Sequence, residues 1–244
     1  CHHPAVAIAE AGDAVVDSGE GVRHVVERLL LAVDIDSDEH PGDQYGILST
    51  MAVLPERSGP ALADIGVFGG SGFYEFLENV ETHESDTPYG LPSGPITIGT
   101  IGDRRVAFLP RHGLSHQFPA HKVPFRANVY ALWALGVRSI LGPCSVGSLQ
   151  PNVHPGDFVV VDQLVDRTWG RADSYHDEGP VHHQMFADPY DDRMRHVLVS
   201  AGRRLGYTVH DGGTMVVING PRFSTRAESA WFREMGWTVA RNVM

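Results

Sequence analysis

The segment IGVFGGSG, Ile65–Gly72, gives the clearest local indication of how this sequence folds. Its apolar beginning, residues 65–68, has the composition of a short buried strand, and a glycine loop follows directly. Glycines in such a loop let backbone N–H groups approach an anion closely, and Ser71 adds a hydroxyl donor. Alone, the loop fits an ordinary turn at a strand end at least as well, so the segments that follow must distinguish the two interpretations.

Strand and helix patterns alternate from residue 65 to the end of the chain. The expected strands are residues 65–68, 96–101, 106–109, 139–141, 158–161 and 214–218, of which the second and third form a hairpin. The expected helices are residues 125–135, 191–205 and 225–235, each followed by a glycine. This alternation predicts an α/β domain built on a mixed, largely buried β-sheet flanked by helices.

Residues 1–64 differ from the rest of the chain. They contain one helix pattern, residues 21–33, between acidic and turn-rich stretches, and no strand pattern. The chain begins with Cys1, whereas Met51 lies shortly before the first strong strand. We therefore expect an N-terminal extension at residues 1–64, with a natural start at Met51, and a main domain at residues 65–244.

The composition is that of a globular protein, with 42% hydrophobic and 20% charged residues among 244. A formal net charge of −11 argues against nonspecific binding of nucleic acid, because its phosphates would be repelled. Two cysteines cannot form a disulfide framework, which favours a reducing compartment, the cytoplasm. No apolar run approaches the roughly 18–20 residues that cross a bilayer. We expect a small-molecule site and neither a nucleic-acid nor a membrane partner.

Two further segments with anion-binding groups follow predicted strands. Arg111 and His112 come after the strand that ends at Leu109, and the donor fork of arginine suits phosphate. The segment PCSVGS, Pro143–Ser148, follows the strand that ends at Leu141 and offers small residues with hydroxyls. Singly, such residues are more often a surface ion pair or a turn. Together with the glycine loop they converge on one edge of one sheet, which predicts an anion site there.

A dinucleotide site fits this pattern less well. Gly66, Gly69 and Gly72 lack the spacing G-x-G-x-x-G that brings a backbone turn close to a pyrophosphate. The segment TPYG, Thr87–Gly90, breaks the chain where a second parallel strand is required. We therefore expect no NAD.

A metal site and a cysteine nucleophile are also disfavoured. His112, His116 and His121 lie in a segment that Pro119 interrupts, and no cluster of cysteines or carboxylates accompanies them. Nothing near Cys144 in the sequence nominates a base to activate its thiol. Cys144 is therefore expected to be a packing residue, and no metal is expected.

Taken together, these segments resemble the purine nucleoside phosphorylase family, and within it the 5′-methylthioadenosine phosphorylase branch. The resemblance runs in order over residues 65–238, and its set of segments is specific although no single one is. The matching segments are IGVFGGSGFY (65–74), DTPYG (86–90), PRHG (110–113), GSL (147–149), PGD (155–157), DQLVDRT (162–168) and GPRFSTRAES (220–229).

The resemblance implies phosphate-dependent cleavage of S-methyl-5′-thioadenosine to adenine and 5-methylthioribose 1-phosphate, a reaction of purine and methionine salvage. It implies a homotrimer with inorganic phosphate as co-substrate and no cofactor. By position, it implies a phosphate site formed by Ser71, Arg111, His112, Cys144 and Ser145, with Cys144 contributing mainly its backbone.

The resemblance also implies where the nucleoside binds. Phe223 is expected against the purine and Ser224 at the border of the base. His183 is expected to reach the ribose pocket of the neighbouring subunit, and Met244 to stand near the ribose. Phosphate then attacks the anomeric carbon through an oxocarbenium-like transition state.

The resemblance stops at the segment TVARNVM, residues 238–244. The family continues there with a strand ending in Asn-Met-Thr and later with purine-binding aspartates, so that Asn242 and Met244 resemble a slipped remnant. The acid that protonates the purine is expected beyond Met244, and general acid catalysis contributes about 10²–10⁴-fold in rate. As a C-terminally truncated phosphorylase, the chain is expected to be weakly active or inactive.

Two alternatives stay open. One is a phosphorylase for 6-oxopurine nucleosides such as methylthioinosine, inosine or guanosine. The other is an inactive remnant that binds phosphate or nucleoside. A hydrolytic nucleosidase fits less well, because Arg111 and His112 make sense mainly when phosphate is the nucleophile.

Overall fold

The computed structural model describes residues 5–11, 26, 30, 60–69, 77–178, 181 and 183–242. Among the residues singled out from the sequence, Ser71, Met51 and Met244 lie outside these ranges. The helix expected at residues 21–33 also lies outside them, except for Val26 and Leu30, which are helical.

The strands and helices expected from residue 65 onward are all present, and most agree with the prediction to within two residues at each end. The strands are β1 (Ala5–Ala11), β2 (Ile65–Gly69), β3 (Glu78–His83), β4 (Ile96–Ile101), β5 (Arg104–Pro110), β6 (Ser139–Ser148), β7 (Phe158–Val160), β8 (Gln163–Arg167), β9 (Val209–Asp211), β10 (Thr214–Ile218) and β11 (Val239–Asn242). The helices are the 3-10 helix η1 (Ala120–Lys122), α2 (Phe125–Ala134), α3 (Asp192–Arg204) and α4 (Arg226–Glu234). No helix in the described ranges is long and apolar enough to cross a membrane.

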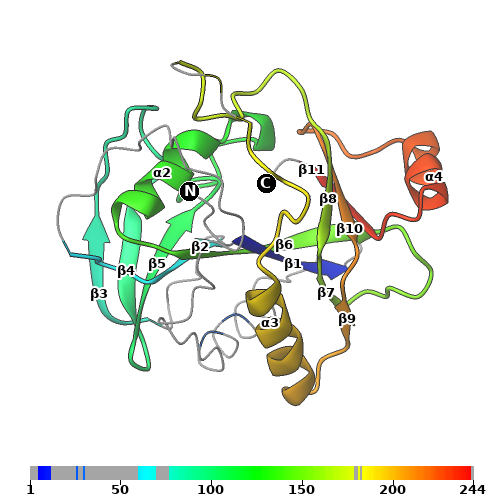
Figure 1. Cartoon of the computed structure of the whole chain (residues 1–244), viewed down its shortest axis with the longest axis horizontal. Helices are drawn as coiled ribbons and strands as arrows, with labels where there is room; N and C mark the ends of the chain where they lie inside the picture. Colours follow the sequence, from blue (N-terminus) through cyan, green and yellow to red (C-terminus); the bar gives the residue numbers. More distant parts are fainter. Residues whose placement is uncertain are drawn as a thin grey trace.

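The strands of the described residues form one connected, mixed β-sheet (Figure 1). Its main path runs in the order β3-β4-β5-β2-β6-β1-β7-β9. β2 lies between β5 and β6 and is parallel to both, with Gly69 opposite Pro110 and Val67 opposite Leu141. The hairpin of β4 and β5 and the pair of β1 and β7 are antiparallel, which confirms the mixed sheet predicted from the sequence.

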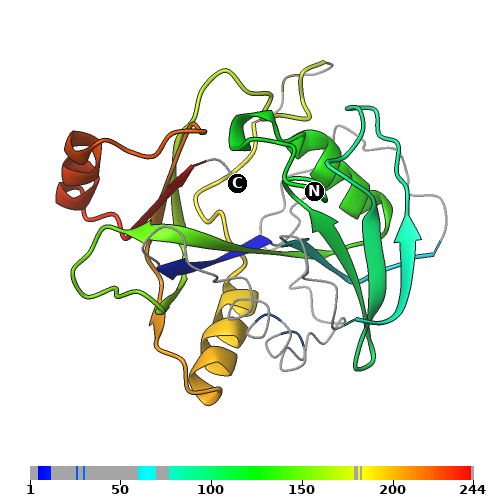
Figure 2. The same cartoon turned by 180° about the vertical axis from the view of Figure 1, so that it is seen from behind.

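Helices α2 and α3 lie on opposite faces of this sheet (Figures 1 and 2). Neighbouring residues of β5 show the two faces, because successive side chains of a strand point to opposite sides. Val106 packs in the cluster that contains Leu198 of α3, whereas Ala107 packs in the cluster that contains Leu132 of α2. A strand buried on both faces has a continuous apolar sequence, as β5 has.

Strands β8, β10 and β11 form a smaller group that joins the main sheet through β6. β10 is parallel to both β8 and β11, and β11 runs antiparallel to β6 with Ala240 opposite Gly147. Helix α4 packs on this group through Phe232, which is buried against Val216 and Ile218. β6 is long enough to pair with both groups of strands, and it therefore connects the two parts of the sheet.

β1 corrects one expectation from the sequence. No strand was predicted before residue 65, yet Ala5–Ala11 lies between β6 and β7, parallel to the first and antiparallel to the second. Alanine is depleted in strands, so local propensity gave little signal for this alanine-rich segment. Val26 and Leu30 are likewise buried in the core cluster of the main sheet. The boundary after residue 64 and the start at Met51 remain predictions.

Candidate active site

The carboxyl ends of β5, β2 and β6 meet at one edge of the main sheet. Because these strands are adjacent and parallel, residues at their ends lie close together. Arg111 directly follows β5, and its backbone N–H donates to the carbonyl oxygen of Gly69, 3.2 Å away at the end of β2. The convergence of strand ends predicted from the sequence is confirmed for β2 and β5.

The Arg111 guanidinium is a partly buried cation without a counter-ion among the described residues. Its Nε and Nη1 atoms are buried and have no hydrogen-bond partner there. Burial lowers the pKa of Arg111 from its ordinary value to about 10, so the side chain remains charged at neutral pH. Buried donors without an acceptor cost free energy, and an oxyanion would satisfy both in one bidentate contact.

His112 stands beside Arg111 with its ring oriented by the following loop. Nδ1 lies 2.9 Å from the carbonyl oxygen of Phe118, to which a ring protonated at Nδ1 donates. Burial lowers the pKa of His112 below 6.5, and the charges of Arg111, His116 and Arg241 lower it further. The Phe118 hydrogen bond acts in the opposite direction. No hydrogen bond occupies Nε2 in the described part of the chain, so the neutral imidazole can offer this nitrogen to a ligand.

Cys144 and Ser145 lie within β6 and not in a turn after it. The sequence predicted that the strand ends at Leu141, which is wrong because β6 continues to Ser148. The continuation is stabilised by pairing with β1 as far as Val146 and then with β11. Cys144 is buried in an apolar cluster, the environment of a packing residue, whereas Ser145 is exposed.

Arg241, in β11, is a second buried arginine near Arg111 that the sequence did not lead us to expect. It is 9% exposed, its Nε donates to the carbonyl oxygen of Asn242 at 3.0 Å, and its buried Nη1 has no partner in the described ranges. Burial first, and then the charge of Arg111, lower the pKa of Arg241 well below its ordinary value. The signal that the sequence offered for this residue was an arginine inside the short strand pattern of residues 239–242.

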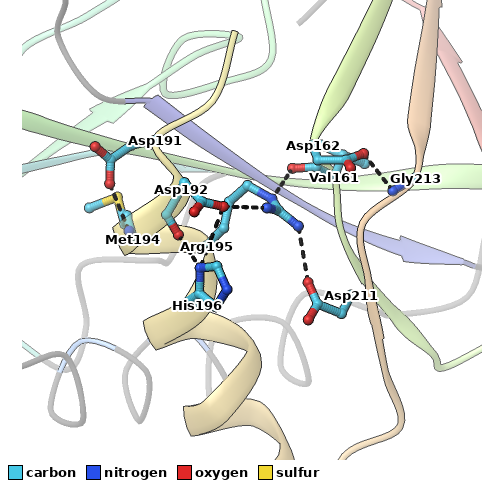
Figure 3. A network of polar contacts seen from close by, with 9 residues as sticks. All are labelled: Val161, Asp162, Asp191, Asp192, Met194, Arg195, His196, Asp211 and Gly213. Carbon is cyan, nitrogen blue, oxygen red and sulfur yellow. Dashed lines mark hydrogen bonds and ion pairs between the residues drawn. The ribbon is translucent and has the colours of Figure 1, made fainter. Parts of the chain in front are cut away.

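Arg195 in α3 shows how the same protein accommodates a buried arginine that has partners (Figure 3). Its guanidinium donates to the carbonyl oxygen of Val161 at 3.0 Å and pairs with Asp192 at 2.9 Å and Asp211 at 3.0 Å. Among the described residues, neither Arg111 nor Arg241 pairs with a carboxylate. The sheet edge is thus a local concentration of positive charge on an acidic protein, which is suited to an anion.

The loop between β10 and α4 presents an aromatic ring to solvent. Phe223 is 73% exposed. Its neighbour Arg222 donates to both carboxylate oxygens of Glu228 at 2.7 Å, and Glu228 completes a capping box with Thr225 at the start of α4. The pKa of Glu228 is lowered to about 2, chiefly by the Arg222 hydrogen bonds. A loop held in this way can offer Phe223 to a planar ligand.

The start of this loop lies beside β11 and η1. A Cβ atom added to Gly220 would lie 2.8 Å from the Cβ of Ala120 and 3.6 Å from the Cβ of Asn242. Ser224 is partly buried, with its hydroxyl 2.8 Å from that of Ser229. The loop, the end of β11 and the segment after His112 therefore come together.

His183 is exposed on the segment between β8 and α3. In the described part of the chain, no hydrogen bond or ion pair joins it to Arg111 or Phe223. Within the described part of one chain, no direct polar contact therefore places His183 at the sheet edge.

The histidines near Arg111 are arranged differently from a ligand cluster. The rings of His112 and His116 stack with centroids 5.7 Å apart, and His121 is exposed. Across the described ranges, no group of three or more His, Cys, Asp or Glu side chains is placed to hold a metal ion.

The phosphorylase superfamily matches residues 64–242, a range that includes the whole sheet edge with Arg111, His112 and Arg241. The chain belongs to the phosphorylase superfamily. Within the superfamily it is 61% identical over 173 residues to S-methyl-5′-thioadenosine phosphorylase of Mycobacterium tuberculosis, covering 70% of this chain and 63% of that protein. It is 49% identical over 185 residues to a purine nucleoside phosphorylase of Streptomyces coelicolor, covering 72% and 66%.

A solved structure of the superfamily confirms the fold. Methylthioadenosine phosphorylase from Schistosoma mansoni, in complex with tubercidin, superposes with a TM-score of 0.69 at 37% identity. The superposition covers 75% of this chain and 72% of that one.

The chain spans 63% and 66% of the lengths of the relatives from Mycobacterium tuberculosis and Streptomyces coelicolor, somewhat less than two thirds of each.

Proposed function

We propose that this protein is a nucleoside phosphorylase that cleaves S-methyl-5′-thioadenosine with phosphate, giving adenine and 5-methylthioribose 1-phosphate. One observation carries the proposal: Arg111, with two buried donors that lack partners among the described residues, stands beside His112 at the edge of a phosphorylase-superfamily sheet. The name of the Mycobacterium tuberculosis relative supports the choice of substrate.

Phosphate is proposed to bind between the strand ends. Arg111 supplies a charged fork and His112 its Nε2 ring nitrogen, while Cys144 contributes backbone and Ser145 its exposed hydroxyl. Ser71, in the glycine loop after β2, completes the set on the basis of the sequence. The adjacency of β2, β5 and β6 supports this grouping.

The reaction follows from holding phosphate next to the sugar. A phosphate oxygen forms the bond to the anomeric carbon as the bond from that carbon to the purine nitrogen breaks. The electron pair goes to the purine, which takes up a proton. Arg111 and His112 keep the phosphate in line, and the bound anion stabilises positive charge that develops on the sugar.

The nucleoside is proposed to bind beside the loop before α4. The exposed ring of Phe223 would lie against the purine, with Ser224 at the edge of the base. The contact of Gly220 with η1 and β11 supports a pocket that joins this loop to the phosphate site. Met244 near the ribose remains a proposal from the sequence.

We also propose a homotrimer in which His183 reaches the ribose pocket of a neighbour. The segment that carries His183 exposes large apolar side chains, which is unusual unless another surface covers them. These residues are Trp169, Val181, Met185 and Phe186. A cytoplasmic location, the absence of nucleic-acid and membrane partners, and phosphate as co-substrate without a cofactor remain predictions from the sequence.

Phosphate-dependent release of adenine from S-methyl-5′-thioadenosine tests the function. The purified chain is incubated with the nucleoside in phosphate buffer and in phosphate-free buffer, and calorimetry measures phosphate binding in parallel. We expect any adenine release, weak as it is expected to be in this chain, to occur only with phosphate. Release at the same rate without phosphate would contradict the proposal in favour of hydrolysis, and binding without turnover would favour the inactive remnant.

A 6-oxopurine nucleoside is the second candidate substrate. The observation that favours it is the 49% identity to a purine nucleoside phosphorylase. Inosine in the same assay distinguishes the two, since faster phosphorolysis of inosine than of S-methyl-5′-thioadenosine would reverse the assignment.

A further inference from the structure

We infer that Arg241 is a second guanidinium ligand of the oxyanion that Arg111 binds, so that the site recognises a dianion such as hydrogen phosphate. This inference rests on the phosphate site proposed above. Its basis is that Arg241 is more than nine-tenths buried and that its Nη1 donor lacks a partner in the described ranges, as Nε and Nη1 of Arg111 do.

The topology brings Arg241 to the site from β11, whereas Arg111 reaches it from β5. Arg111 follows β5, beyond β2, whereas β11 lies on the far part of β6 with Ala240 opposite Gly147. Because β11 runs antiparallel to β6, its chain approaches Ser145 as it passes Arg241. Asn242, the next residue, lies against Gly220, which in turn meets Ala120 of the segment after His112.

The charges at the site agree with this placement. Arg241 is close enough to both Arg111 and His112 for its charge to influence each of them. Two like charges repel, and within the described ranges neither has the carboxylate partners that Arg195 has (Figure 3). The two guanidinium groups carry two positive charges and a neutral His112 adds none. One hydrogen phosphate dianion would neutralise them. A ligand therefore supplies what the described protein groups lack.

Three variants separate this role from a structural one. Arg241→Gln removes the proposed ligand, Arg111→Gln removes the ligand of the proposed function, and Arg233→Gln removes the same charge from α4, where its Nε donates to the carbonyl oxygen of Leu149. The affinity for inorganic phosphate is measured by calorimetry at constant ionic strength. Thermal unfolding is measured for each variant with and without phosphate.

We expect Arg241→Gln to weaken phosphate binding by about tenfold to a hundredfold, the effect of one charge-assisted hydrogen bond. Without phosphate, the same variant should melt at a higher temperature than the parent, because an unpaired buried cation has been removed. Arg233→Gln should leave the phosphate affinity unchanged. A merely structural arginine would produce the opposite result, a variant that melts at a lower temperature.

The outcomes distinguish the inference from the proposed function. If the parent binds no phosphate, or Arg111→Gln binds it as tightly as the parent, the phosphate site itself is wrong and the inference falls with it. If Arg111→Gln loses binding while Arg241→Gln keeps parental affinity, only the inference is overturned. An Arg241→Gln variant that melts below the parent without phosphate also overturns it.

Discussion

Arginine side chains that lie within this protein have two opposite kinds of environment. Arg195 has carbonyl and carboxylate acceptors around its guanidinium, whereas donors of Arg111 and Arg241 lack partners among the described residues. An unpaired buried charge destabilises the folded state, while a paired one costs much less. At the scale of single residues, the energetic imbalance at Arg111 and Arg241 is therefore the strongest indication of a ligand.

Arg111→Lys should lower the affinity for phosphate by about tenfold, the order of one lost charge-assisted hydrogen bond. Lysine keeps a positive charge but replaces the planar fork with a single point charge that cannot make the bidentate contact. Calorimetric titration with inorganic phosphate measures the change. Arg138→Lys, at an exposed position, is the control, and parental affinity of Arg111→Lys would argue against a bidentate contact.

His112 should make the stability of the ligand-free protein depend on pH below 6.5. Its folded-state pKa is lowered by burial and by the charges of Arg111, His116 and Arg241, so the unfolded chain binds more protons in this range. The free energy of unfolding therefore falls as the pH drops from 6.5 through the folded-state pKa of His112. Urea unfolding across this range measures the slope.

His112→Gln should flatten that slope, because the variant has no imidazole to protonate at this position. His121→Gln, which changes an exposed histidine, should leave the slope as it is in the parent. An unchanged slope in His112→Gln would assign the pH dependence to other groups.

At the scale of elements, the continuity of β6 decides how the site is assembled. Its first residues pair with β2, its middle with β1, and Gly147 and Ser148 with β11. The strand thus brings β11, which carries Arg241, into the same sheet as β5, which precedes Arg111. A turn after Leu141 would have separated these elements.

Thr225→Ala should lower the free energy of unfolding by about 1 kcal/mol, the usual effect of losing a helix N-cap. Thr225 accepts the backbone N–H of Glu228 through Oγ1, and Glu228 accepts the backbone N–H of Thr225 in return. Thr225→Ser keeps the hydroxyl and should stay close to the parent. Urea unfolding of the three proteins checks this, and equal losses in both variants would rule out the cap as the cause.

Gly202→Ala should destabilise the protein by about 1–3 kcal/mol, the range for overpacking a core. Alanine is otherwise the better helix former, but a Cβ at Gly202 of α3 would lie 2.7 Å from Cγ2 of Val209 in β9. The double variant Gly202→Ala, Val209→Ala should recover part of the loss, because the clashing methyl group is gone. Urea unfolding measures both, and a Gly202→Ala protein as stable as the parent would contradict the close packing.

At the scale of the whole molecule, the exposed apolar segment between β8 and α3 predicts self-association. Sedimentation equilibrium should give three times the chain mass of 26.6 kDa. Phe186→Ser should weaken the trimer, because it removes an aromatic side chain that is 62% exposed in the single chain. Val80→Ser, which changes a 51% exposed residue on the edge strand β3, should leave it intact. A monomeric parent would contradict the assembly.

The sequence predicted much of this molecule, and its failures have identifiable causes. The β4–β5 hairpin and helix α2, between Pro124 and Gly136, follow from turn residues and apolar periodicity that act over a few positions. Arg111 and His112 could be placed at a sheet edge because residues after parallel strands converge there. Cys144 was expected as a packing residue and is buried in an apolar cluster.

From the sequence alone came six of the strands and the three long helices after residue 65, the mixed α/β sheet and the strand-end position of Arg111, since each depends on local patterns. The short strands β3, β8 and β9 were not predicted. Only the tertiary structure decided that Ala5–Ala11 is a strand, that β6 extends to Ser148 and that Arg241 joins Arg111. These features depend on which distant segments become neighbours. Pairing with a partner strand overrides weak local propensity, and the burial of a charge is set by everything that packs around it.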